Sequence, residues 1–169
     1  LIQTHWINAT DAPFDGQTAF NLKVTKPKAE HKTAQLFTTA ATQFVLPQGL
    51  ASTYAECVVK QDLNLFMLGG HMHYYGKRVK ITHTPVASAT GKVIYDTPWN
   101  HEYEFAPPRN SYPTDAPFIL KVGDKLRADC EYDNNSGGEL PFPSEMCVLF
   151  TYAYPMVEQV NCVDGNWGN

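Results

Sequence analysis

The sequence has 169 residues, of which 43% are hydrophobic and 18% charged, and its formal net charge is −4. This length predicts one domain, large enough to bury a sizeable core. The charge balance excludes the basic surface of a nucleic-acid-binding protein. The longest apolar runs, at residues 65–68 and 146–150, are far shorter than the roughly 20 residues that a membrane-spanning helix needs. We therefore expect neither a nucleic acid nor a membrane as a partner.

Short segments that are rich in apolar residues, some of them alternating with polar ones, recur between glycines, prolines and asparagines, a pattern typical of β-strands. In chain order, the expected strands lie at residues 21–24, 39–46, 54–59, 63–73, 78–83, 93–95, 118–122, 125–130 and 147–154. Twelve prolines disfavour long helices. Short strands at this spacing predict an all-β fold, an antiparallel β-sandwich or jelly roll.

The cysteines are even in number and include no C-x-x-C pair; they are Cys57, Cys130, Cys147 and Cys162. Metal-binding cysteines usually come in close pairs, so two disulfides are the better interpretation, and three pairings remain open. Asn8 and Asn134 each begin an Asn-x-Ser/Thr sequence, the acceptor pattern for N-glycosylation. These features favour an oxidising compartment, so we expect a secreted or periplasmic protein.

The clearest local motif is Gly69-Gly70-His71-Met72-His73. On a strand, His71 and His73 project to the same face, close enough to share a metal ion. Met146, just before the last long strand, offers a third ligand, and a thioether with two imidazoles suits Cu(I) better than Zn, Mg or Ca. A zinc site with His83 or His101 as the third ligand remains open, as does a purely structural role for these residues.

Other patterns narrow the chemistry. A blue-copper site is disfavoured because no histidine follows Cys147. His31 lies in a charged stretch and is expected to be solvated, and a lone histidine such as His5 is usually structural. Neither a nucleophile elbow nor a phosphate-binding loop is present in the sequence.

The order of the cysteines, of His71-Met72-His73 and of Glu145-Met146-Cys147 resembles the C-terminal catalytic domain of the copper type II, ascorbate-dependent monooxygenases. This family includes peptide-hydroxylating and dopamine-hydroxylating enzymes, and the His-Met-His variant is similar to bacterial members. The opening residues resemble the last strand of the family's N-terminal domain. We therefore expect residues 1–15 to form that strand and the interdomain crossing, and residues 16–169 to form the copper-binding catalytic domain.

The resemblance implies that His71, His73 and Met146 are the copper ligands and the catalytic residues. It also implies two disulfides, Cys57 with Cys162 and Cys130 with Cys147. The second would anchor the strand that carries Met146 and, on the chain-entropy model, contribute about 3 kcal/mol, while the longer loop of the first would contribute about 4–5 kcal/mol.

The resemblance further implies an oxidoreductase in which O₂ is activated at this copper and a substrate C–H bond is hydroxylated, with ascorbate as the reductant. A second copper is expected on an N-terminal domain, bound by three histidines, and His5 matches one of them. Because the other two are absent here, we expect this chain to be part of a larger monooxygenase and inactive by itself. A non-catalytic copper-binding sandwich and the zinc site remain the alternatives.

The expected substrate pocket differs from that of the peptide-hydroxylating branch. That branch holds a terminal carboxylate with an Arg, an Asn and a Tyr, and the matching positions here are Gly69, Val148 and Phe150. Without a guanidinium at Gly69, the resemblance implies a neutral or apolar small-molecule substrate. Tyr74, just past the expected ligands, is a further candidate for the pocket wall.

Overall fold

The computed structural model describes residues 4, 8 and 10–168, and the chain divides into two compact units, Leu1–His31 and Lys32–Asn169. Between residues 10 and 31 of the first unit there is neither strand nor helix. The strand predicted at residues 21–24 is therefore wrong: Leu22 and Val24 are 75% and 85% exposed. Apolar alternation alone does not make a strand, because the backbone also needs a partner strand and the side chains a core.

The second unit is built from two β-sheets and a small two-stranded ladder. The first sheet contains β1 (Gln35–Ala41), β4 (Leu63–His71), β7 (Arg109–Ser111), β8 (Phe118–Leu120), β11 (Cys147–Tyr154), β12 (Val160–Val163) and β13 (Asn166–Gly168). The second sheet contains β3 (Gly49–Val58), β5 (Gly76–Thr84), β6 (Lys92–Pro98) and β9 (Lys125–Asn134). The ladder joins β2 (Val45–Leu46) to β10 (Leu140–Pro141), and a 3₁₀-helix, η1, spans His101–Glu104.

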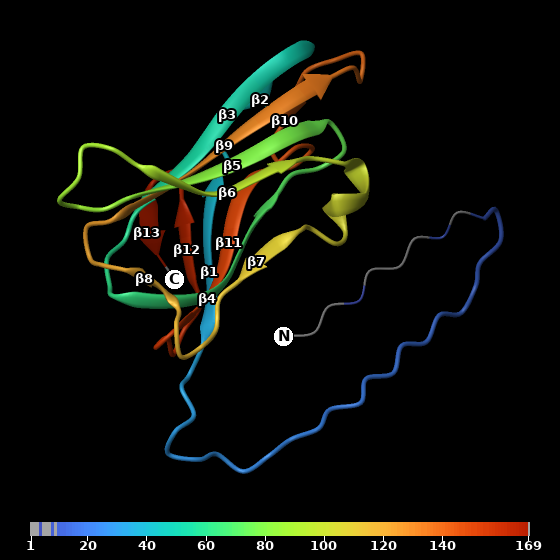
Figure 1. Ribbon diagram of the computed structural model, residues 1–169. Coiled ribbons are helices and arrows are strands. Elements are labelled where there is room, and N and C mark those ends of the chain that lie inside the picture. Colours follow the sequence, from blue (N-terminus) through green and yellow to red (C-terminus); the bar gives the residue numbers. More distant parts are fainter. Residues whose placement is uncertain (1–3, 5–7, 9, 169) are drawn as a thin grey trace. The chain divides into compact units, whose positions relative to one another are not determined.

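The two sheets form two layers, with β3, β9, β5 and β6 lying across β1, β11, β4 and β12 (Figure 1). The first sheet runs in the order β13-β12-β1-β11-β4-β7, with β8 also paired to β4, and the second in the order β3-β9-β5-β6. Neighbouring strands are antiparallel except for the parallel pair of β1 and β12. The predicted all-β, antiparallel sandwich is confirmed; its jelly-roll topology stays a prediction.

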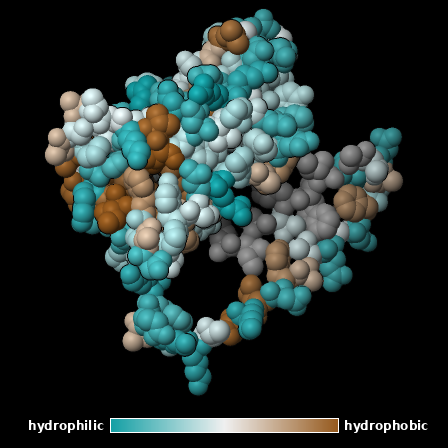
Figure 2. Space-filling model, viewed as in Figure 1, coloured by the Kyte–Doolittle hydropathy of each residue, from teal (hydrophilic) through white to brown (hydrophobic). Residues whose placement is uncertain are grey.

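The core lies between the layers because strand side chains alternate between faces. On β9, for example, Leu126, Ala128 and Cys130 are fully buried, while the residues between them face outward. Polar residues cover most of the visible surface, with small apolar patches among them (Figure 2). Within the described residues, no helix is both long and apolar enough to cross a bilayer.

Two disulfides link the layers. Cys57 on β3 is bonded to Cys162 on β12, and Cys130 on β9 is bonded to Cys147 on β11, with Cα atoms 6.1 and 5.8 Å apart. This is the pairing that the family resemblance implies. Each bond ties one strand of the second sheet to one strand of the first, so the layers are held in register by covalent bonds as well as by packing.

Candidate metal centre

Two antiparallel strands, β4 and β11, bring the candidate ligands together. His71, the last residue of β4, lies directly opposite Val148 on β11. Directly opposed residues of an antiparallel pair share one face of the sheet. Strand β4 ends at His71, not at the predicted residue 73, so His73 lies two residues past it, and Met146 directly precedes β11. The Glu145 carboxylate accepts hydrogen bonds from the backbone N–H groups of both His73 and Met146. The three candidate ligands therefore gather at one end of this strand pair.

The two histidine rings lie close together. Their centroids are 5.1 Å apart, with the rings nearly perpendicular at 85°. Burial and, to a smaller extent, the neighbouring His73 together lower the pKa of His71 to about 4. At neutral pH the His71 imidazole is therefore uncharged, which is the form that binds metals.

His73 is oriented by contacts on both its ring and its backbone. Its Nδ1 lies 3.2 Å from the carbonyl oxygen of Ser144, so a proton on Nδ1 is donated to that carbonyl. Nε2 then carries the lone pair that can bind a metal, a ring arrangement typical of metal-binding histidines. The Trp99 indole N–H donates to the His73 carbonyl at 3.0 Å, and the Trp99 ring stands edge-on to that of His71, with centroids 6.3 Å apart.

A buried carboxylate connects the two ligand-bearing segments. Glu145 is fully buried, and its Oε2 accepts hydrogen bonds from the backbone N–H groups of His73 (3.0 Å) and Met146 (3.3 Å). Its Oε1 accepts one from the Tyr75 N–H at 2.6 Å. Burial raises the pKa of Glu145 above its usual range, although the three N–H donors act in the opposite direction. The Tyr132 hydroxyl also donates to the Met146 carbonyl, at 2.7 Å.

Beside the candidate ligands, the outward face of the strand pair is apolar. Gly69 lies opposite Phe150, and a Cβ on Gly69 would lie 2.6 Å from the Phe150 Cζ and 2.9 Å from the Pro108 carbonyl oxygen. The Phe150 ring thus occupies the space that a side chain at Gly69 would need. Phe150 and Val148 are both half-buried next to His71. Tyr74 is 59% exposed and its ring lies 5.2 Å from that of His101.

One residue on this face was missed by the sequence analysis. Arg109 on β7 lies directly opposite Gly69, which places it on the same face as His71. It is exposed, and no ion pair or hydrogen bond of its guanidinium occurs among the described residues. No motif surrounds Arg109, and its proximity to Gly69 arises only from the pairing of β7 with β4.

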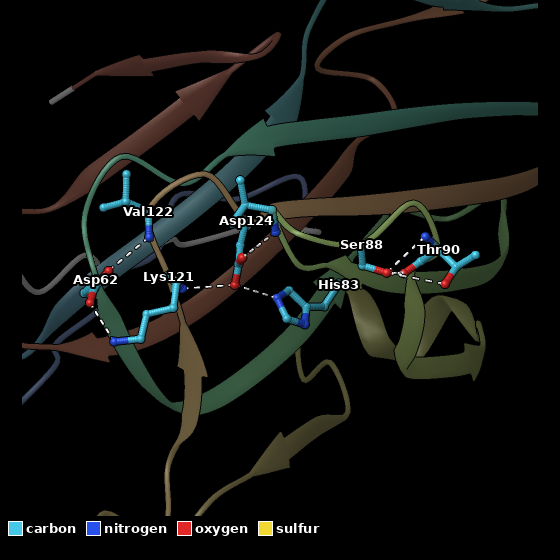
Figure 3. Close-up of polar contacts among 8 residues, drawn as sticks. Asp62, His83, Ser88, Thr90, Lys121, Val122 and Asp124 are labelled. Carbon is cyan, nitrogen blue, oxygen red and sulfur yellow. Dashed lines mark hydrogen bonds and ion pairs between the residues drawn. The ribbon is translucent and has the colours of Figure 1, made fainter.

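The remaining histidines do not complete a zinc site in the described part of the chain. His83 lies on β5 in the second sheet, where its Nε2 is 2.8 Å from the carboxylate of buried Asp124. Asp124 also accepts the backbone N–H groups of Val86 and Lys121 (Figure 3). Among the residues described, no three His, Cys, Asp or Glu side chains form a group that could hold a metal ion. His5, the predicted ligand of a second copper, lies outside the described residues.

Of the two possible glycosylation acceptors, Asn134 has a structural role. It is 1% exposed, and its Nδ2 donates to the carbonyls of Leu46, Pro47 and Gly138 at 3.3, 3.1 and 2.8 Å. An amide nitrogen buried in this way is not accessible to a glycosylating enzyme. Asn8 is exposed.

The fold and its two inter-sheet disulfides define a disulfide-linked, all-β sandwich domain. Residues 32–166 match the family model described as "Copper type II ascorbate-dependent monooxygenase, C-terminal domain". The chain therefore belongs to the copper type II, ascorbate-dependent monooxygenase family and contains its C-terminal domain, as its sequence predicts.

One solved structure, described as "Structure of infectious bursal disease virus Gx strain", is 9% identical to this chain, with a TM-score of 0.15. The alignment covers 80% of this chain and 43% of the viral one, so this chain spans less than half of that protein's length. A similarity this weak carries no information about fold or function.

Proposed function

We propose that this chain is the catalytic copper domain of a monooxygenase that hydroxylates a C–H bond of a small-molecule substrate, and that His71, His73 and Met146 hold the copper. Family membership supports copper and ascorbate dependence and monooxygenase chemistry at the coarse level. The observation that supports the choice of ligands is that the His71 and His73 rings lie 5.1 Å apart while the Glu145 carboxylate accepts hydrogen bonds from the backbones of both His73 and Met146.

The donor set fits a copper ion. Two imidazoles and a thioether are soft enough to favour Cu(I), whereas Mg and Ca prefer oxygen ligands and structural zinc sites prefer thiolates and further histidines. The uncharged His71 ring needs no deprotonation before it binds a metal at neutral pH. When bound, copper would supply one-electron and O₂ chemistry.

The surrounding residues would hold the ligands in place. Ser144 and Trp99 fix the position of the His73 ring and backbone. Glu145 fixes the spacing between the His73 and Met146 backbones. A site that depends on close geometry needs such support, because small displacements of ligands weaken metal binding.

We further propose that the face beside the ligands binds the reacting part of a neutral or apolar substrate. Val148 and Phe150 form an apolar wall next to His71, and no side chain fits at Gly69. Such a wall excludes water from the reacting C–H bond. Tyr74 would border this region beside the residues that follow β4. Arg109, which lies opposite Gly69, would border it on the side of β7.

The complete reaction also needs a source of electrons. We propose that an N-terminal domain of the same protein carries a second copper, with His5 as one ligand, and that ascorbate reduces it. Residues 1–15 would then lead from that domain to residues 16–169. The two disulfides fit a secreted or periplasmic protein. On this proposal the 169-residue chain binds one copper but does not turn over alone.

The test is an anaerobic Cu(I) titration of the purified chain against a competing chelator. One tightly bound copper per chain is expected, with binding strongly weakened in Met146→Ala and His71→Ala. Met67→Ala and His101→Ala are the matched controls, because Met67 is a half-buried methionine on β4 and His101 an exposed histidine. Copper binding that is indifferent to Met146→Ala would refute the ligand set. Copper binding without ascorbate-dependent turnover in the full-length protein would favour the non-catalytic alternative.

A further inference from the structure

The strand β3 is an unusually long open edge. It pairs with β9 along all ten of its residues and, within the part of the chain that the structure describes, with no strand on its other side. Alternate residues of an antiparallel strand direct their N–H and C=O groups away from the partner strand. The outer side of β3 therefore presents a row of unpaired backbone donors and acceptors, a template for another strand.

The other edges of the two sheets are protected against such pairing. The edge strand β6 carries Lys92, Asp96 and Pro98, and β7, β8 and β13 have only three residues each. Short edges, charged residues and prolines are the usual means by which proteins block edge-to-edge association. β3 has no Lys, Arg or Pro, and its single charge, on Glu56, is compensated by Lys125 (3.1 Å) and Arg127 (3.8 Å) on the neighbouring β9.

The residues on the outward face of β3 are complementary to themselves in one antiparallel register. We propose that two copies of this chain dimerise by pairing their β3 strands about a two-fold axis at Tyr54. In this register Leu50 of each copy lies opposite Val58 of the other, and the two Tyr54 residues lie opposite each other. These residues are 84%, 37% and 52% exposed, so the pairing removes apolar surface from water. Glu56 lies opposite Ser52, so no like charges face each other.

There is open space on the inward side of the same edge. A cavity of about 370 Å³ runs beside Thr53, Ala55 and their neighbours on β3, and Asp164 and Gly165 form its other wall. In the proposed register Thr53 of one copy lies opposite Ala55 of the other. The side chains that the second copy turns toward this cavity are therefore small. The proposal is independent of the copper site, since β3 belongs to the opposite sheet.

The first test is sedimentation velocity of the 169-residue chain over a range of concentrations. A reversible monomer–dimer equilibrium is expected, and Leu50→Lys should abolish the dimer by placing a charge opposite Val58. Val93→Lys is the matched control, because Val93 is a 47% exposed apolar residue on the other long edge strand, β6. A chain that is monomeric at every concentration, or a dimer that survives Leu50→Lys, would overturn the proposal.

A cysteine experiment tests the register. In Tyr54→Cys the two new thiols face each other with Cα atoms about 4.5–5.5 Å apart, inside the roughly 4.4–6.8 Å range of disulfides, so mild oxidation should produce a covalent dimer. In Ser52→Cys the two thiols are displaced by four residues, roughly 13 Å along the strand, and should not crosslink. Mixing Ser52→Cys with Glu56→Cys should restore the crosslink. Equal crosslinking of Tyr54→Cys and Ser52→Cys alone would refute this register.

Discussion

The carboxylate of Glu145 accepts a hydrogen bond from the backbone N–H of His73 at 3.0 Å. Because Glu145 directly precedes Met146, one buried side chain ties together the two segments that carry the candidate ligands. The same carboxylate accepts two further N–H groups, from Met146 and Tyr75. The geometry of the candidate site thus depends on a side chain that is not one of the proposed ligands.

Replacing this carboxylate should affect both folding and copper binding. Glu145→Gln replaces one acceptor oxygen with an NH₂ group that faces backbone N–H donors, so we expect a loss of about 1–3 kcal/mol in the free energy of unfolding. The Cu(I) affinity should fall by roughly 10–100-fold, as it does when groups that orient metal ligands are removed. Denaturant unfolding and chelator competition measure the two effects. Glu139→Gln is the control, because Glu139 is exposed. An unchanged Cu(I) affinity in Glu145→Gln would show that the proposed ligands do not need the Glu145 carboxylate to hold them in place.

The two disulfides should differ in their effect on the copper site. Removing Cys130 and Cys147 together should cost about 3 kcal/mol of stability, and removing Cys57 and Cys162 about 4–5 kcal/mol. The loss of Cu(I) affinity should be larger for the variant without Cys130 and Cys147, because Cys147 adjoins Met146. Cys57 and Cys162 tie β3 to β12, so their removal should weaken Cu(I) binding less. Double Cys→Ala variants, compared by denaturant unfolding and Cu(I) titration, test this. Equal losses of affinity in both would indicate a general loosening of the fold.

Gly69 should tolerate no side chain. In Gly69→Ala the new Cβ meets the Phe150 ring at 2.6 Å and the Pro108 carbonyl at 2.9 Å, and the carbonyl belongs to backbone that cannot rotate away. We expect a loss of about 1–3 kcal/mol, the usual cost of overpacking. Gly138→Ala is the control because nothing lies within 4 Å of a Cβ at that position. Equal melting temperatures of the two variants would mean that β7 moves aside without cost.

The buried pair of His83 and Asp124 should make the stability of the fold fall as the solution becomes acidic. Burial opposes ionisation of Asp124, but hydrogen bonds from Lys121 and Val86 backbone N–H groups and from His83 outweigh it, so the pKa of Asp124 is lowered. A lowered pKa stabilises the fold above the unfolded-state value of about 3.9, and this contribution is lost as the pH falls through the folded-state value below it.

Asp124→Asn should therefore flatten the decline of unfolding free energy below about pH 4, relative to the wild-type chain. The measurement is denaturant unfolding at a series of pH values between neutrality and the acid limit. Asp115→Asn, in an exposed loop, serves as the control. If the unfolding free energy of Asp124→Asn falls with pH as steeply as that of the wild type, groups other than Asp124 cause the loss of stability in acid.

Period-two alternation allowed much of the fold to be predicted from the sequence. The strand expected at residues 147–154 is β11. His71 and Val148 share a face because β4 and β11 pair without interruption from His71 to Met67. The pattern failed at residues 21–24, where alternation is present but no partner strand is. The short strands β7, β12 and β13 were missed because three or four residues carry too little pattern.

The supports of the candidate site were not predictable from local sequence. Glu145 accepts hydrogen bonds from the backbone N–H groups of His73 and Tyr75, in the segment after β4. A pattern of side chains in the sequence does not predict such bonds to the backbone. Arg109 reaches the His71 face only through the register of β7 with β4. Trp99, which contacts both candidate histidines, lies in the loop after β6. Each of these contacts is created by tertiary pairing.

On the proposed ligand set, the bond between Cys130 and Cys147 would also matter for the maturation of the domain. Met146 directly precedes Cys147, which is bonded to Cys130 on β9, so we expect its position to be less well defined before that bond has formed. On the proposed ligand set, the reduced chain leaving the ribosome offers copper two histidines but no ordered third donor. Copper acquisition would then follow oxidative folding in time and place, and a reducing cytosol would leave the domain empty of metal.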